Sequence, residues 1–255
     1  MKSVKILGIS NSFGEDCMEY VYEILKDLGV EEVKASYLYF GGCSLWSHCE
    51  FAKKDAPEYR FSVNTDGVWE HNEGCTMKTA IESDEWDYIF TQQASPSSGR
   101  KETYGDLDEL MAYVKAHAKG NPTYGWQMTW AYANGFDSTN FDAYDRDQMK
   151  MYNGIVEAVK EKILPRTDIT KVFPSGTAIQ NARTALGDVL NRDGFHLNLK
   201  IGRYIAGLCV VKGLLGLDID NVSYAPEGVS EREKEVAIKA VNSACEKPFE
   251  VTEIK

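Results

Sequence analysis

The sequence predicts an α/β protein in which a mainly parallel β-sheet is flanked by helices. Short apolar runs alternate with amphipathic segments over most of the 255 residues, and that alternation is typical of such a sheet. A hydrophobic fraction of 43% is enough for one large core. No internal repeat, low-complexity tract or interdomain linker interrupts the pattern, so we expect a single domain over residues 1–255.

The first half of the chain begins with a strand, a helix and a second strand. Residues 4–9 form an apolar run of strand length, and apolar side chains then recur at helical spacing over residues 20–28. Gly29 ends that helix, and a second strand follows at about residues 33–39. The pair Gly41-Gly42 then breaks the strand.

The rest of the chain continues the alternation after one interruption. Residues 59–63 and 68–70 flank Asn64-Thr65-Asp66-Gly67, a turn-forming sequence that indicates a small β-hairpin outside the main sheet. The remaining predicted elements are strands at residues 86–91, 122–126 and 171–174, and helices at about residues 107–118, 147–164, 178–190, 199–215 and 231–244.

Charge and composition exclude several classes of partner. The formal net charge of -11 comes from 39 acidic and 28 basic residues without a long basic tract, so we expect no nucleic acid and no anionic membrane as partner. No apolar run approaches the roughly 20 residues of a membrane span. The chain starts directly with a strand, which predicts a cytoplasmic protein, or a secreted or periplasmic one if a signal peptide has been removed. Its six cysteines are too sparse for a disulfide-built scaffold, and the oligomeric state stays open.

Candidate catalytic groups follow the predicted strands. In parallel sheets the binding crevice lies outside the carboxyl ends of the strands, and here those ends carry Asn11-Ser12, Gly41-Gly42 and Gln92-Gln93. Near the end of the chain, Asp193 lies three residues before His196. A serine hydroxyl needs a base to take its proton and a carboxylate to orient that base. Ser12, His196 and Asp193 are therefore a candidate catalytic triad.

These motifs resemble those of the SGNH (GDSL-like) hydrolases, and in particular an uncharacterised bacterial branch of that group. The resemblance rests on Ile9-Ser10-Asn11-Ser12, Gly41-Gly42-Cys43-Ser44-Leu45, Gln92-Gln93-Ala94-Ser95 and Asp193-Gly194-Phe195-His196. It implies a three-layer α/β/α sandwich with about five parallel strands. It also implies hydrolysis of an ester through a covalent acyl-serine, without a cofactor.

The resemblance assigns roles to the three triad residues. Ser12 would be the nucleophile, His196 the base that takes its proton and later protonates the leaving alcohol, and Asp193 the group that orients the imidazole. Taken alone, Ser12 is as well explained as the N-cap of a helix, because serine is a common choice at that position. The downstream Asp193 and His196 favour the catalytic interpretation.

The resemblance also implies an oxyanion hole, with one departure from the usual pattern. The backbone N–H groups of Ser12 and of Gly42, or else Gly41, would bind the oxyanion, since a glycine lets the backbone approach the substrate closely. The third donor of the group normally comes from a Gly-x-Asn-Asp block after the third strand, and this sequence has none there. Gln92 or Gln93 would supply an amide instead.

Other residues are weaker candidates for substrate or metal binding. Trp126, Trp130 and Tyr132 could form a stacking wall for a sugar or an apolar slot for an acyl chain, although aromatic residues at such spacing are more often core. His48 would line the crevice or face solvent. A structural zinc site is also conceivable from soft ligands, but their spacings do not fit the usual short pairs, and we expect no metal; the residues concerned are Cys43, His48, Cys49, His71 and Cys75.

We therefore expect a serine esterase that hydrolyses short- to medium-chain acyl esters, on carbohydrates or as simple lipid-like esters. A lipase acting on longer acyl chains is the nearest alternative within the enzymes. A glycan-binding module that kept the fold and lost its chemistry is the alternative from another class.

Overall fold

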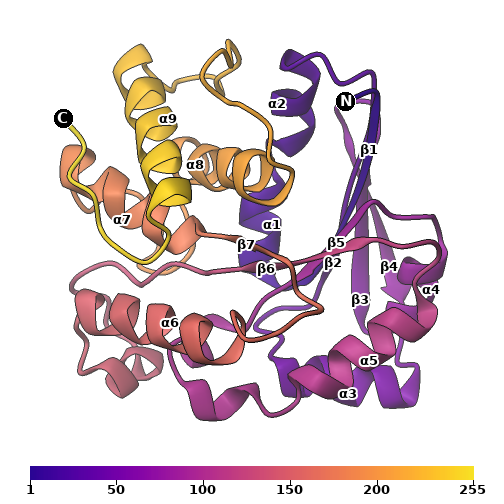
Figure 1. Cartoon of the computed structure of the whole chain (residues 1–255). Coiled ribbons are helices and arrows are strands. Elements are labelled where there is room, and N and C mark those ends of the chain that lie inside the picture. Colours follow the sequence, from indigo (N-terminus) through magenta and orange to yellow (C-terminus); the bar gives the residue numbers. More distant parts are fainter.

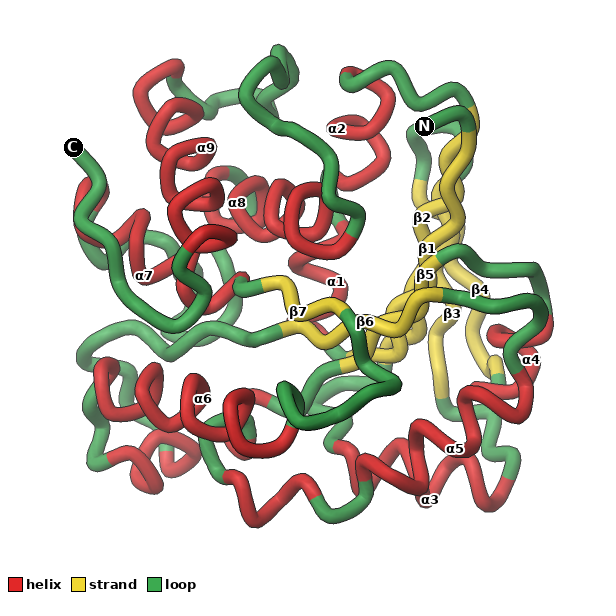
Figure 2. Tube along the Cα trace, viewed as in Figure 1, coloured by secondary structure: helices red, strands yellow, loops and turns green.

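The computed structural model describes all of residues 1–255 and is built around one seven-stranded sheet. The strands are β1 Ser3–Ser10, β2 Glu32–Tyr39, β3 Tyr59–Asn64, β4 Trp69–Cys75, β5 Tyr88–Thr91, β6 Thr123–Gln127 and β7 Lys171–Phe173. They lie side by side in the order β4-β3-β2-β1-β5-β6-β7, and Figure 2 shows them passing through the middle of the molecule.

Five of these strands are parallel, as predicted. β2, β1, β5, β6 and β7 pair in register with their neighbours, and β1 lies at the centre between β2 and β5. Because β1 and β2 end level at Ser10 and Tyr39, and Ile9 pairs with Thr91, the loops after three strands meet at one edge. That edge is where a parallel sheet forms its binding crevice.

The predicted hairpin exists, but the expectation that it lies outside the main sheet is wrong. β3 pairs antiparallel with β2, and β4 pairs antiparallel with β3, so the hairpin extends the sheet. Without it, β2 would present a row of unpaired backbone groups at the edge of the sheet. The mostly exposed β4 takes over that edge position.

Helices cover both faces of the sheet, which confirms the α/β/α sandwich (Figure 1). One face carries α1 Ser12–Met18, α2 Val21–Asp27, α7 Ser175–Leu186, α8 Ile201–Cys209 with its π-helical continuation η4 Val210–Leu214, and α9 Glu231–Glu246. The other carries α3 Leu45–Lys54, α4 Met77–Glu82, α5 Leu107–His117 and α6 Gln148–Lys162. Short 3₁₀ helices lie in loops: η1 Ser95–Ser97, η2 Lys101–Tyr104 and η3 Thr139–Tyr144.

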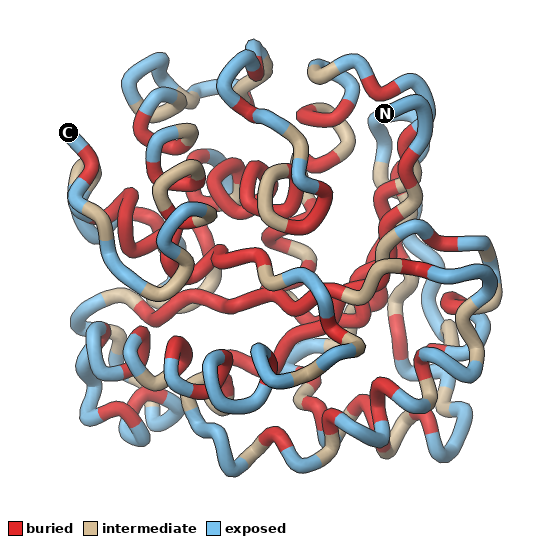
Figure 3. The backbone as a smooth tube through the Cα atoms, in the orientation of Figure 1, coloured by how far each residue is buried: buried red, intermediate tan, exposed pale blue.

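Apolar side chains from the sheet and both helical layers form one continuous hydrophobic cluster. Figure 3 shows the central strands almost wholly buried, while the outer helices alternate between buried and exposed positions. β1 is buried from Ile6 to Ser10, and its residues from Ile6 to Ile9 are apolar, as expected of a strand covered on both faces. No helix combines the length and the apolar character that crossing a bilayer would require.

Candidate active site

Helix α1 begins at Ser12, the candidate nucleophile. β1 ends at Ser10, and Asn11 caps α1 by accepting a hydrogen bond from the N–H of Phe13 at 2.9 Å. Ser12 is thus the first residue of the helix, and its hydroxyl is not used as the cap. At Gly14, a Cβ atom would lie 2.0 Å from the Ser10 hydroxyl, so only glycine allows α1 to turn back so close to β1.

Asn11 also ties together the loops that follow three strands. Its amide donates to the carbonyl of Cys43 at 3.0 Å, in the loop after β2. Its Oδ1 accepts a second hydrogen bond, from Nε2 of Gln92 at 2.6 Å, just after β5. Because the Asn11 side chain is 2% exposed, these bonds are shielded from water and hold the three loops in a fixed arrangement.

Ser12, His196 and Asp193 form one continuous chain of hydrogen bonds. Oγ of Ser12 lies 2.8 Å from Nε2 of His196. On the far side of the ring, Nδ1 lies 2.7 Å from Oδ2 of Asp193. The other carboxylate oxygen accepts the backbone N–H of His196 at 2.8 Å and of Phe195 at 3.2 Å. The fold thus brings together groups that are 184 residues apart.

The electrostatics of Asp193 fix the tautomer of the imidazole. Partial burial by itself would raise the pKa of Asp193, but hydrogen bonds from the His196 ring and from two backbone N–H groups outweigh it, and the pKa is lowered. The ionised carboxylate accepts the proton on Nδ1 of His196, which leaves Nε2 unprotonated. That nitrogen faces the Ser12 hydroxyl, so it can accept the hydroxyl proton.

A cavity of about 300 Å³ opens beside Ser12 and His196. Its other lining residues are Asn11, Phe13, Tyr39, Gly41, Gly42, Ser95, Pro96, Tyr132, Asn140 and Phe195. The N–H groups of Gly41 and Gly42 make no hydrogen bond to the backbone. Gly42 has a φ of 67°, a conformation that favours glycine. Since Ser12 is the first residue of α1, its own N–H also has no partner within the helix.

The aromatic rings of Phe195 and Phe13 pack against the imidazole of His196. The ring of Phe195 lies with its centroid 3.8 Å from that of His196, and Phe13 contacts the imidazole edge-on at 6.1 Å. Trp130 in turn stacks on Phe13 at 4.1 Å with an angle of 6° between the rings. Its Nε1 donates to the carbonyl of Phe195 at 2.8 Å.

The structure does not bring the predicted substrate-binding residues into the cavity. Trp130 is 0% exposed and supports the site from the core, and Trp126 packs against Tyr104 in the interior. His48 is also fully buried, hydrogen-bonded to the Tyr59 hydroxyl at 2.8 Å, and burial lowers the pKa of His48 to about 3. These three assignments are corrected, because Trp126 points into the core from β6, His48 from α3, and Trp130 from the loop after β6.

Neither glutamine reaches the cavity, which corrects the expected third oxyanion donor. Nε2 of Gln92 is used on Asn11, and the side chain is 0% exposed. Gln93 donates to the carbonyl and hydroxyl of Thr103 at 2.9 and 3.1 Å, and accepts the N–H of Leu45 at 3.1 Å. Both amides brace the loops around the site instead of facing a substrate.

Three further side chains line the cavity, and only Tyr132 among them was considered from the sequence, as part of an aromatic wall with Trp126 and Trp130. Tyr39 ends β2, Tyr132 follows β6, and Asn140 lies in η3. Tyr132 shares a hydrogen bond of 2.9 Å with the hydroxyl of Ser95. Position at the end of a strand is a signal for Tyr39, but nothing in the sequence places η3 over the site, because that packing depends on a long loop.

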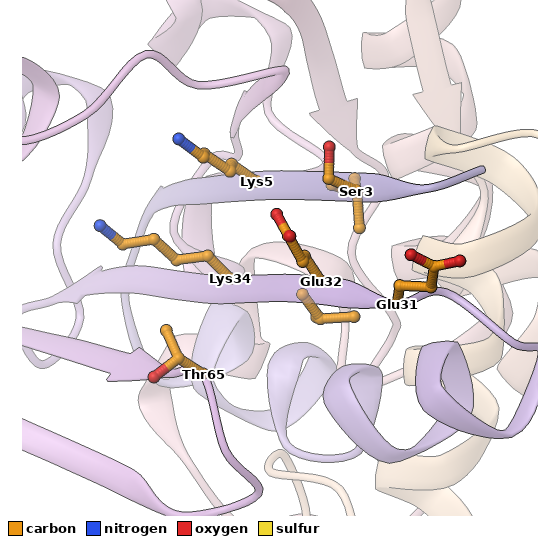
Figure 4. Close-up of a pocket in the computed structure, with 8 residues that line it drawn as sticks. Ser3, Lys5, Glu31, Glu32, Lys34 and Thr65 are labelled. Carbon is orange, nitrogen blue, oxygen red and sulfur yellow. The ribbon is translucent and has the colours of Figure 1, made fainter.

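A second cavity, of about 360 Å³, lies at the opposite end of the strands (Figure 4). Lys5 and Lys34 project side by side along its wall, and both pair with the single carboxylate of Asp84, at 2.7 and 2.8 Å. It contains no nucleophile paired with a base, so the cavity beside Ser12 is the better candidate for chemistry. No three or more His, Cys, Asp or Glu side chains gather in a metal-binding arrangement.

Comparisons with known proteins agree with this fold. The chain is similar to a DUF4886 family protein from Bacteroides uniformis, with 39% identity and a TM-score of 0.95, covering 99% of this chain and 98% of the other. It is also similar to a putative SGNH hydrolase from Slackia heliotrinireducens, with 17% identity, a TM-score of 0.54 and coverage of 83% and 99%.

A variant of an acetyl-xylooligosaccharide esterase from Geobacillus is also similar, with 12% identity and a TM-score of 0.51. The match covers 86% of this chain and 98% of the esterase. At such low identities these two hydrolases show that the fold is shared, and no more. No curated protein gives a significant match. The family model described as a domain of unknown function (DUF4886) matches residues 5–244, and the chain therefore belongs to the DUF4886 family, with the fold of the SGNH hydrolases.

Proposed function

We propose that this protein is a serine esterase that transfers an acyl group from an ester to water. The observation that carries the proposal is the hydrogen-bonded chain from Ser12 through His196 to Asp193, at the edge of a cavity with unpaired backbone donors. A buried or surface serine without such a chain would have no means of losing its proton at neutral pH.

The reaction follows from the positions of these groups. Oγ of Ser12 attacks the ester carbonyl while its proton passes to Nε2 of His196. The tetrahedral intermediate collapses, the bond to the alcohol oxygen breaks, and His196 returns the proton to the leaving alcohol. Water then attacks the acyl-serine while the same nitrogen takes one of its protons. The bond to Oγ of Ser12 breaks, the carboxylic acid is released, and His196 returns the proton to Oγ, which restores the Ser12 hydroxyl.

The developing oxyanion would be bound by backbone N–H groups of Ser12 and of Gly42 or Gly41. A third donor would come from the cavity wall, where Tyr39 carries a hydroxyl and Asn140 an amide, and both residues line the cavity. Removing one such donor typically lowers the rate by about 100- to 1000-fold. Tyr39→Phe and Asn140→Ala therefore separate the two possibilities, because only the variant that loses the donor shows a fall in kcat of that size.

The size and lining of the cavity favour small acyl groups on a polar alcohol. A volume of about 300 Å³ is at the low end for a small-molecule site, and aromatic rings beside a polar amide suit a sugar face. An acetylated carbohydrate fits this description, and an acetyl-xylooligosaccharide esterase is among the proteins that share the fold.

Hydrolysis of p-nitrophenyl esters of increasing chain length tests the proposal. We expect turnover of acetate, a decline beyond medium chains, and loss of turnover by at least about 1000-fold in Ser12→Ala. Faster turnover of long chains would favour a lipase. Turnover that is equal in the wild type and in Ser12→Ala would show that the fold serves binding and not this chemistry.

A further inference from the structure

The loop that carries His196 is tied to the helix that carries Ser12 at a second point. Asp16 lies one turn beyond Ser12 on α1, so both side chains project from the same face of the helix. Oδ2 of Asp16 accepts the backbone N–H of Leu197, the residue after His196, at 2.8 Å. Two successive residues of the loop are thus held by two residues one helical turn apart.

Asp16 is also the meeting point of two arginines. Its Oδ1 accepts from Nη1 of Arg192 at 3.0 Å and from Nε of Arg203, on α8, at 2.8 Å. The Asp16 side chain is 0% exposed, so its charge is screened only by these partners. Removing one member of a buried ion pair leaves an uncompensated charge, which makes this cluster sensitive to single substitutions.

Arg192 lies between the carboxylates of Asp16 and Asp193, and which of them it binds affects the basicity of His196. Its Nη1 binds Asp16, while its Nε lies 4.0 Å from Oδ2 of Asp193, the oxygen bonded to the His196 ring. If Arg192 turned fully to Asp193, it would compete with the imidazole for that oxygen. The carboxylate would then stabilise the protonated ring less well.

We propose that Asp16 is a positioning residue, which fixes the Asp193–His196 loop against the nucleophile helix and limits Arg192 to a contact of 4.0 Å with Asp193. The role rests on the proposed function, since it concerns the base of that reaction. Asp16 is not among the residues that line the cavity, so it would act on the reaction only through the loop and Arg192.

The other charges near His196 have their own partners. Glu15 on α1 pairs with Arg60 on β3, and Glu19 at the end of α1 pairs with Arg203 on α8. Asp188, just after α7, pairs with Arg183 on α7. Glu19 supplies a matched control, because it is the C-cap residue of α1 and binds Arg203 at 2.7 Å but makes no bond to the loop.

The test is an NMR titration of the His196 ring in the intact protein, with its signal identified by loss in His196→Ala. In Asp16→Asn the amide oxygen can still accept from Leu197, but the amide N–H₂ faces the guanidinium groups. Of its two bonds through Nη1, Arg192 then keeps only the one to the Leu197 carbonyl, so it is held less firmly away from Asp193. We expect the midpoint to fall by about 1 pH unit. In Arg192→Gln the nearby positive charge is removed, and the midpoint should rise.

The double variant Asp16→Asn/Arg192→Gln should return the midpoint close to the wild-type value. Glu19→Gln should move it by less than about 0.3 pH unit, because its charge lies a turn further along α1. An unchanged midpoint in Asp16→Asn, or shifts of the same sign in both single variants, would overturn the inference. If Asp16→Asn does not fold, Arg192→Gln still provides the test, because the Arg192 side chain is partly exposed. A titration midpoint of His196 that does not rise in Arg192→Gln would then overturn the inference.

Kinetics separate this role from general structural support. In Asp16→Asn we expect kcat for a p-nitrophenyl ester to fall by about 10-fold or more with KM little changed, and the acid limb of the rate profile to move to lower pH. A wild type without any ester turnover would refute the proposed function, while the NMR shifts would still decide the role of Asp16. Normal turnover with no shifts would refute the positioning role alone.

Discussion

Replacing Asn11 should affect stability more than its size suggests, because one side chain serves three loops. Asn11→Ala removes the cap of α1 and the partners of two buried groups, the Cys43 carbonyl and the Gln92 amide. Loss of a cap costs about 1 kcal/mol. Each buried polar group left without a partner costs about 1 to 3 kcal/mol. Taking the low end for all three gives a loss of about 3 kcal/mol in the free energy of unfolding.

Urea unfolding measures this loss, and a second cap provides the control. Ser44 caps α3 by accepting a hydrogen bond from the N–H of Ser47 at 3.2 Å, and its hydroxyl also lies 3.0 Å from that of Ser47. Neither partner lies in another loop, so Ser44→Ala should lose only about 1 kcal/mol. For a chain of this length, about 3 kcal/mol corresponds to a fall in Tm of roughly 6 to 12 °C. If Asn11→Ala is no less stable than Ser44→Ala, Asn11 does not hold the three loops together as inferred.

Two further predictions concern buried groups near the site. Because the pKa of His48 is lowered to about 3 by burial, the unfolded chain binds the additional proton first, and stability should fall as pH drops from the ordinary histidine value of about 6.5 toward 3. A His48→Phe variant should show a shallower loss of stability in that window, and an unchanged slope would contradict a neutral His48. Gly14→Ala places a Cβ atom 2.0 Å from the Ser10 hydroxyl and should displace α1, which lowers both Tm and kcat. Gly105→Ala is the control and should change neither, because nothing lies within 4 Å of its added Cβ atom. Equal effects of the two substitutions would refute the packing argument.

Much of the fold follows from local pattern in the sequence. The five parallel strands were predicted because their apolar runs are long enough to be distinctive and are separated by amphipathic helices. α1 was not predicted, because Ser12–Met18 is short and contains Gly14, and its stability comes from the Asn11 cap and from packing. The hairpin joined the sheet because β2 has an edge to cover, which is a property of the whole sheet.

The candidate site was predictable in its reactive groups and not in its walls. Ser12, Asp193 and His196 belong to short motifs whose residue types limit their chemistry, and the structure brings all three together. Trp130 and Gln93 carry chemistry that suits a binding wall, yet both point into the protein. Which way such a side chain points depends on contacts between distant segments, and the spacing of residues along the chain does not contain that information.

Arg203 illustrates the same limit. From its place on a helix it is most simply explained as part of a surface ion pair. In the structure its side chain is 12% exposed and joins Asp16 and Arg192 beneath the His196 loop. Only the three-dimensional arrangement shows that this pair belongs to the support of the candidate base.

The most direct measurement of the central claim is labelling by a fluorophosphonate, followed by peptide mass spectrometry. A serine activated by a neutral imidazole displaces fluoride and forms a stable phosphonyl adduct, and its reactivity does not depend on knowing the natural ester. We predict a single adduct on Ser12, absent in Ser12→Ala and strongly slowed in His196→Ala. An unlabelled wild type, or an adduct on another residue with Ser12 untouched, would contradict the account.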